Sequence, residues 1–370
     1  MPKLLVTSRD VPGWGGASTR AYLLFEKLQR DGWDVGFINL IKDSQEEEIR
    51  HLFGDSFGNP RSLSGVHTSA LREPTWETQP ELRELILSSA PRAILAFGFN
   101  ATLAARSAAP GVPLTFMTVG SRVEHLVETG VVRDFMDFEG RPDTAALDSD
   151  RHDREPRAVE GCDRIIVHSP LVRFAFDHRF PGARDKIHPR TISLADLSYD
   201  AAREAGTPRT PFAARDIDLL FVASDWARPM KNYALVREIA ARLPELRTHV
   251  VGAYDAPCPH AVHHGVVPSR LELFTLLGRC KTLACPSLLD AAPNVLFEAS
   301  AMGCNVVATR NCGNWELCND ELLAERCTAD DFVECIRRSL SHAHADNRDR
   351  FRGGYDALVE ALNRFQRISG

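Results

Sequence analysis

The sequence has no long hydrophobic run and no block of basic residues. Because no stretch of about 18 apolar residues occurs, we expect no membrane-spanning helix. The first ten residues, MPKLLVTSRD, contain a short apolar run but not the longer apolar segment of a secretory signal peptide. With a formal net charge of −6 and no Lys/Arg cluster, nucleic acid is not an expected partner. These absences predict a cytoplasmic protein.

Closely spaced cysteine pairs are also lacking. All nine cysteines lie at or after Cys162, none forms a Cys-x-x-Cys pair, and their spacing does not resemble a zinc site. We expect small, buried thiols in a reducing compartment. The neighbouring His263 and His264 suggest a metal pair, but no cluster of carboxylates lies near them in the sequence. We therefore expect no bound metal.

Length and composition predict two α/β domains. A chain of 370 residues with 44% hydrophobic and 25% charged residues is typical of a soluble globular protein of more than one domain. Two successive series of strands and helices predict two Rossmann-like domains that face each other across a cleft. A polar segment rich in Pro and Gly between them marks a linker. The predicted units are an N-terminal domain at 1–200, a linker at 201–216, a C-terminal domain at 217–346 and a returning C-terminal helix at 347–370.

The first domain opens with a strand at 3–8, a glycine-rich loop and a helix from Thr19. The loop, RDVPGWGGAST, matches neither the G-x-G-x-x-G dinucleotide fingerprint nor a P-loop, so neither site is supported. Gly15 and Gly16 allow a close approach between backbone and ligand, while a flexible turn remains the alternative. We also predict a strand at 186–193.

The stretch 286–307, PSLLDAAPNVLFEASAMGCNVV, reads as a turn and short helix between two strands. Pro293 and Asn294 mark the start of the helix. Asp290 precedes this helix and Glu298 lies within its first two turns. A helix N-terminus attracts phosphate, and carboxylates accept hydrogen bonds from sugar hydroxyls. The alternative is an ordinary αβ unit with two solvated carboxylates.

Ser121 and His125 follow the predicted strand PLTFMTVG in the first domain. They therefore cluster at the carboxyl end of a strand, where open α/β sheets bind their ligands. For His125, a place on a solvated helix face remains the alternative.

Several segments together resemble the retaining GT-B glycosyltransferases of family 4. In the second half they are SDWARPMKNY, HHGVVPSRLELFTLL and PSLLDAAPNVLFEASAMGCNVVAT; in the first half they are PGWGGAST and CDRIIVHSPLVR. The resemblance covers most of 217–320 and is patchier before it. It implies the GT-B fold and sugar transfer from a nucleoside diphosphate sugar without a bound metal or other cofactor.

The resemblance also implies residue roles. Asp290 would contact the donor sugar and Glu298 the nucleotide ribose, while Arg228 and Lys231 would neutralise the diphosphate. The other residues implied at the donor are Gly15, Gly16, Gly265, Val266, Asn294 and Val295. On the acceptor side it places Ser121 and His125. Asp290 is shorter than the Glu more usual at its position, and Gly120 and Ser121 stand where many members carry a His.

Three alternatives to a glycosyltransferase stay open. They are a nucleotide-sugar epimerase on the same fold, an enzyme that couples non-sugar cyclitols, and a catalytically idle binding scaffold. The resemblance implies a small-molecule, glycan or carrier-bound acceptor. Membrane association is not favoured, because the N-terminal half is acidic and shows no basic amphipathic helix. The oligomeric state is left open.

Overall fold

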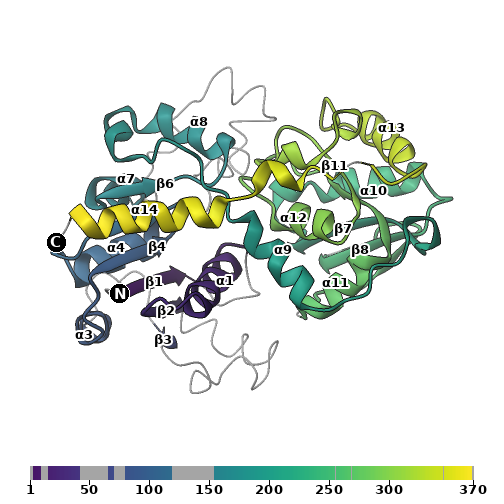
Figure 1. Ribbon diagram of the computed structural model, residues 1–370. Coiled ribbons are helices and arrows are strands. Elements are labelled where there is room, and N and C mark those ends of the chain that lie inside the picture. Colours follow the sequence, from purple (N-terminus) through teal and green to yellow (C-terminus); the bar gives the residue numbers. More distant parts are fainter. Residues whose placement is uncertain are drawn as a thin grey trace.

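A computed structural model gives the structure of the chain for residues 3–9, 16–41, 66–70, 80–118, 154–254, 256–267, 269–344 and 346–368. Six parallel strands form the sheet of the N-terminal domain (Figure 1). They are β1 Leu4–Arg9, β2 Val35–Ile41, β3 Val66–Ala70, β4 Ala93–Phe97, β5 Leu114–Met117 and β6 Arg164–Ile166. Their order, β3-β2-β1-β4-β5-β6, is that of a Rossmann sheet.

Helices cover this sheet, which explains why its central strands are apolar along their whole length. Every residue of β4, for example, is buried. The helices of this part of the chain are α1 Gly16–Arg30, α3 Pro80–Ser88, α4 Phe99–Ala108, α7 Arg154–Gly161, α8 Pro170–Arg179 and the short helix η4 Pro181–Lys186.

Five parallel strands form the second sheet, in the order β11-β10-β7-β8-β9. They are β7 Ile217–Asp225, β8 Thr248–Ala253, β9 Ala261–His263, β10 Cys280–Cys285 and β11 Asn305–Ala308. The helices of this domain are α10 Tyr233–Arg242, α11 Arg270–Arg279, α12 Asn294–Ala301 and α13 Ala329–Ser339. Its short helices are η6 Pro229–Lys231, η7 Trp315–Leu317 and η8 Asp320–Leu322. Every residue of β10 except Lys281 is buried, as expected of a central strand in a parallel sheet.

Two helices connect the domains (Figure 1). The first, α9 Ala195–Glu204, packs against α1 of the N-terminal domain and α12 of the C-terminal domain. The second, α14 Gly354–Ile368, follows η9 Arg348–Phe351 and returns to the N-terminal domain. There its Leu358 is fully buried in the same core as β1.

The predicted fold of two Rossmann-like domains is confirmed, and three local predictions need correction. Segment 186–193 is not a strand: it forms one bridge, between Ile187 and Ile165, and Pro189 lacks the N–H that a ladder needs. The helix α9 covers the start of the predicted linker. The last helix begins at Gly354 and not near residue 347, because Gly353 has a φ of +82° that a helix cannot contain. The predicted limits of the two domains, 1–200 and 217–346, stay predictions.

The cysteines agree with the sequence analysis: all nine are free, and all except Cys327 are buried. Between residues 3 and 368, no described helix combines the length and the apolar character needed to cross a bilayer.

Candidate functional site

Lys231 is held against the loop that follows β10. The carbonyl of its neighbour Met230 accepts a 2.8 Å hydrogen bond from the amide of Leu288. The next residue, Asn232, has a left-handed backbone with φ 57°, and its Nδ2 donates to the carbonyl of Pro286 at 3.1 Å. These two bonds fix η6 on the loop, so the Lys231 side chain has a defined place beside it.

Asp290 is the buried carboxylate of that loop, with 6% of its surface exposed. Its amide donates to the carbonyl of Asn311 at 3.0 Å, and its carbonyl accepts from the amide of Gly313 at 2.8 Å. Its Oδ1 accepts from the amide of Ala292 at 3.2 Å. Its Oδ2 lies 2.5 Å from Lys231 Nζ. The structure therefore brings two residues of the predicted site together as an ion pair.

Glu298 lies in the second turn of α12. This helix begins at Asn294, as Pro293 and Asn294 predicted. Glu298 is 7% exposed, and its Oε1 lies 3.5 Å from Arg270 Nη2 of α11. Burial raises the pKa of Glu298, and the charges of Arg270 and Arg20 act in the opposite direction. The site thus holds a second buried carboxylate close to the start of α12.

Arg20 joins this group from the opposite domain. Its Nη2 donates to Asn294 Oδ1 and, at 3.3 Å, to the carbonyl of Ala292. In return, Asn294 Nδ2 donates to the carbonyl of Gly16 at 2.8 Å. Burial lowers the pKa of Arg20 to about 10, although the two buried carboxylates raise it, so the guanidinium stays charged at neutral pH. The sequence analysis assigned Gly16 and Asn294 but missed Arg20, whose spacing matches an ordinary helix face.

A second contact between the domains involves Ser169, the N-cap of α8. Its Oγ donates to the carbonyl of Ala291 at 2.7 Å, and both residues are buried. The preceding His168 is also buried, with Nδ1 3.0 Å from Thr118 Oγ1. Burial and then the charge of Arg20 lower the pKa of His168 to about 3, so its ring is neutral. Both His168 and Ser169 lie in the segment CDRIIVHSPLVR, which carries part of the family resemblance, but the sequence analysis assigned neither of them to the site.

We call these contacts the interdomain junction, which comprises Gly16, Arg20, Ser169, Ala291, Ala292 and Asn294. It lies next to the Lys231–Asp290 pair, because the Asp290 carboxylate accepts from one junction residue, Ala292.

The structure also describes the other predicted residues of the second domain, which are Arg228, Gly265, Val266 and Val295. Arg228 is on the same loop as Lys231, but its Nη2 lies 3.1 Å from Met230 Sδ. Gly265 has a φ of +64°, and its carbonyl accepts a 2.7 Å hydrogen bond from the end of β8. Val266 is 47% exposed, whereas Val295 packs against the hydrophobic core. The roles assigned to these residues stay predictions.

Three predicted residues, Gly15, Ser121 and His125, lie outside the described residues. Their assignments to the donor and to the acceptor side also stay predictions.

Within the described ranges, one cluster has the ligand spacing of a metal site, and it lies outside the group around Asp290. Ligand atoms of Glu321, His342 and His344 lie within 4.8 Å of one another. His344 Nδ1 already pairs with Glu321 Oε1 at 2.7 Å. The predicted possibility of a His263–His264 metal pair has no support, because His263 bonds back to the loop after β8 while His264 bonds to a histidine of β8.

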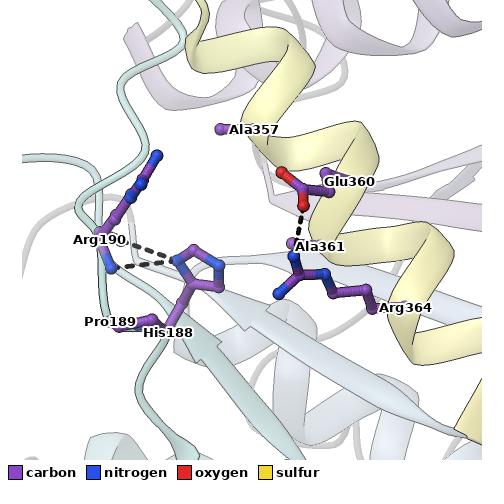
Figure 2. A pocket seen from close by; sticks show the side chains of 7 residues that line it. All are labelled: His188, Pro189, Arg190, Ala357, Glu360, Ala361 and Arg364. Carbon is purple, nitrogen blue, oxygen red and sulfur yellow. Dashed lines mark hydrogen bonds and ion pairs between the residues drawn. The ribbon is translucent and has the colours of Figure 1, made fainter.

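A pocket of about 260 Å³ lies elsewhere, between α14 and the segment 188–190 (Figure 2). In Figure 2 Arg364 pairs with Glu360 of the same helix, and the His188 ring bonds to the backbone of Arg190. The pocket is lined by His188, Pro189, Arg190, Ala357, Glu360, Ala361 and Arg364. It contains none of the predicted site residues, so the candidate site is the group around the interdomain junction.

Comparison with known proteins finds a family match in the second domain. Residues 216–342 match the family model described as glycosyl transferases group 1. That range contains Arg228, Lys231, Asp290 and Glu298. No curated protein sequence matches the chain.

Solved structures match the chain along almost its whole length. Sucrose-phosphate synthase from Thermosynechococcus elongatus is 18% identical, with 98% of each chain covered and a TM-score of 0.66. HepE from Anabaena, in complex with UDP, is 16% identical over 98% of this chain and 100% of its own, with a TM-score of 0.63. The catalytic domain of starch synthase IV from Arabidopsis thaliana, bound to ADP and acarbose, is 11% identical over 100% and 99% of the two chains, with a TM-score of 0.59. At these identities the matches establish the fold of both domains.

Proposed function

We propose that the chain, whose residues 216–342 match the group 1 glycosyl transferases and whose fold is GT-B, transfers a sugar from a nucleoside diphosphate sugar to a hydroxyl acceptor with retention of configuration. One observation carries this proposal: two buried carboxylates, Asp290 and Glu298, lie on either side of the start of α12, and Asp290 forms an ion pair with the partly buried Lys231. The similar HepE has been solved with UDP and with UDP-glucose, which supports a donor of this class.

The donor diphosphate lies, in this proposal, at the N-terminus of α12. The first amides of a helix have no intrahelical acceptor and favour a bound anion. Lys231 supplies a point charge beside them, and Arg228 supplies a guanidinium that can grip two phosphate oxygens. Glu298 accepts hydrogen bonds from the ribose hydroxyls, and Asp290 accepts them from the hydroxyls of the sugar.

The transfer step breaks the bond between the anomeric carbon and the β-phosphate oxygen. The acceptor oxygen forms its bond to the same face of the anomeric carbon, and its proton passes to the departing phosphate. Negative charge therefore grows on the leaving diphosphate, where Arg228 and Lys231 stabilise it. The step needs no carboxylate nucleophile and no oxidant or reductant.

Contact between the domains protects this step from water. The junction bonds of Ser169 and Arg20 join the two domains beside the proposed donor site. Exclusion of water strengthens the charge interactions and limits hydrolysis of the donor. We assign the acceptor to the N-terminal domain, on the side of Ser121 and His125, and place the enzyme in the cytoplasm.

Thermal stabilisation by nucleotides tests the proposal. The protein is heated with UDP, GDP, ADP, dTDP and their sugars, without added metal. A hundredfold excess over Kd stabilises by about 2.7 kcal/mol, so one nucleotide should raise Tm clearly. The Glu298→Ala variant should lose this rise in Tm, whereas the control Glu272→Ala, which changes an exposed glutamate, should keep it. No shift with any nucleotide would refute the proposal. Sugar products formed from the donor alone would instead favour an epimerase.

A further inference from the structure

Arg20 belongs to the N-terminal domain, but its guanidinium ends on the C-terminal domain. It lies in the second turn of α1, is 9% exposed, and contacts Asn294 and Ala292 across the interdomain junction. Its pKa responds to Asp290 and Glu298, the two carboxylates assigned above to the donor sugar and ribose. The cation is therefore close to the place proposed for the diphosphate.

The N-termini of two helices meet at the same place. α1 begins at Gly16 and α12 begins at Asn294, and the Asn294 side chain donates to the Gly16 carbonyl at 2.8 Å. The approach is close, because a Cβ added to Gly16 would lie 2.9 Å from Asn294 Nδ2. Each helix start carries a partial positive charge, and Arg20 adds a full one. Such a convergence favours an anion between the helices.

The hydrogen bonds of Arg20 are incomplete. Its Nη2 has two neutral oxygen partners, whereas its Nε is buried and has no hydrogen-bond partner among the described residues. A buried N–H without an acceptor costs free energy, and more so in a charged group. A planar guanidinium offers neighbouring N–H groups in the geometry that two phosphate oxygens accept. A phosphate group would satisfy both the charge and the unpaired Nε.

We propose that Arg20 is a phosphate ligand that the N-terminal domain contributes to the donor site, so that the donor diphosphate holds the two domains together. This inference rests on the proposed function, because it assumes that the donor lies at the start of α12. Lys231 and Arg228 belong to the donor domain and can bind phosphate with the domains apart. Arg20 can bind the same phosphate only when the two domains are in contact. A hydrogen bond from Arg20 to the phosphate therefore couples donor binding to domain closure.

This role predicts a specific defect. Loss of Arg20 should weaken the binding of nucleoside diphosphates more than that of the matching monophosphates. The second phosphate of a diphosphate reaches the junction, whereas a monophosphate binds through its ribose and base. A charged hydrogen bond lost at this site corresponds to about a ten- to hundredfold rise in Kd. If the role of Arg20 were purely structural, its loss would weaken the binding of both ligand classes by the same factor.

The test is calorimetric titration of the full chain with UDP, GDP, ADP and dTDP and with the matching monophosphates. The variants are Arg20→Gln, Arg20→Lys, which keeps the charge but loses the planar fork, and Arg30→Gln as the control. Arg30 is on the same helix but is half exposed and pairs with Glu204 of α9. We expect the preference for diphosphate to fall at least about tenfold in Arg20→Gln, to fall less in Arg20→Lys, and to persist in Arg30→Gln.

Other outcomes overturn the inference in distinguishable ways. If Arg20→Gln prefers diphosphates as strongly as the wild type does, the inference is contradicted. The same holds if the variant loses affinity for diphosphates and monophosphates by the same factor. In both cases the proposed function still stands. If Arg20→Gln does not fold, Arg20→Lys decides: a preference equal to that of the wild type contradicts the inference. If the wild-type protein binds no diphosphate, the proposed function fails and the inference fails with it.

Discussion

Lys231 Nζ lies 2.5 Å from Asp290 Oδ2, and the two side chains are only 16% and 8% exposed. In the absence of a donor, each neutralises the other. When the donor binds, its diphosphate would replace Asp290 as the partner of Lys231, and a sugar hydroxyl would donate a hydrogen bond to Asp290. The pair therefore holds both side chains in place before the donor binds.

Lys231→Met should reduce sugar transfer at least about a hundredfold, because a fixed cation on the leaving group is lost. It should also reduce stability by about 3–5 kcal/mol, since Asp290 stays buried without its partner. Lys281→Met is the matched control, because Lys281 pairs with Asp218 at 2.9 Å in the same domain. It should keep the activity and lose less stability, because Asp218 still pairs with Arg247 at 2.9 Å. Comparison of initial rates and urea unfolding of both variants checks this, and near-normal turnover in Lys231→Met would refute the role.

Nucleotide binding should depend on the charge of Glu298. Burial raises the pKa of this carboxyl, so as pH falls it takes up a proton before an exposed glutamate does. The neutral acid is a weaker acceptor for ribose hydroxyls, and affinity should therefore decline as pH falls through the raised pKa. Glu298→Gln should bind about ten- to hundredfold more weakly and show no such decline. Kd values from pH 5 to 8 measure both effects; equal pH dependence in the two proteins would contradict the assignment.

Gly313 should tolerate no side chain. A Cβ at this position would lie 1.8 Å from the carbonyl of Ala291 and 2.7 Å from Ser169 Oγ. Because Gly313 also donates to the Asp290 carbonyl, displacement would disturb the interdomain junction and the site together. Gly313→Ala should lower Tm and reduce transfer at least about tenfold, as a small misplacement of reacting groups can cost more than that. Gly111→Ala, with no atom within 4 Å of the added Cβ, should do neither. Equal Tm values and equal transfer rates for the two variants would contradict the role of the close contact between Gly313 and Ala291.

His168 should make the folded protein sensitive to acid. Its pKa is lowered from 6.5 to about 3 by burial and by Arg20. Between these values the unfolded chain binds a proton that the folded protein does not, so stability falls as pH falls. The loss is about 1.4 kcal/mol per pH unit, or about 2 kcal/mol from pH 6.5 to pH 5.

His168→Gln should lack this contribution, whereas His178→Gln, which changes an exposed histidine, should keep it. Urea unfolding at several pH values measures the difference, using the N-terminal transition if the domains unfold separately. Parallel stability curves for wild type and His168→Gln would contradict the prediction.

The sequence was most informative where the chain is locally regular. Pro293 and Asn294 marked the start of α12, and the spacing of Asp290 and Glu298 placed both around it. Local rules cover this segment because its turn, helix and strands are consecutive. They failed at 186–193, where we predicted a strand but Pro189 prevents a ladder.

The contribution of the N-terminal domain could not be predicted in the same way. Arg20 and Asn294 are 274 positions apart, and Ser169 and Ala291 are 122 apart. An arginine in an amphipathic helix or a serine before a proline normally indicates a solvated face or a helix cap. Only the packing of the two domains reveals that these side chains meet a predicted donor site.

Proton NMR of the reaction with the nucleotide sugar that stabilises the protein tests the central claim most directly. The mixture contains that donor and a panel of hydroxyl acceptors. The account predicts release of nucleoside diphosphate and a new glycoside with the same anomeric configuration as the donor, both reduced at least about a hundredfold by Lys231→Met. An inverted product, a changed donor sugar without release of the diphosphate, or no turnover of a donor that binds would contradict it.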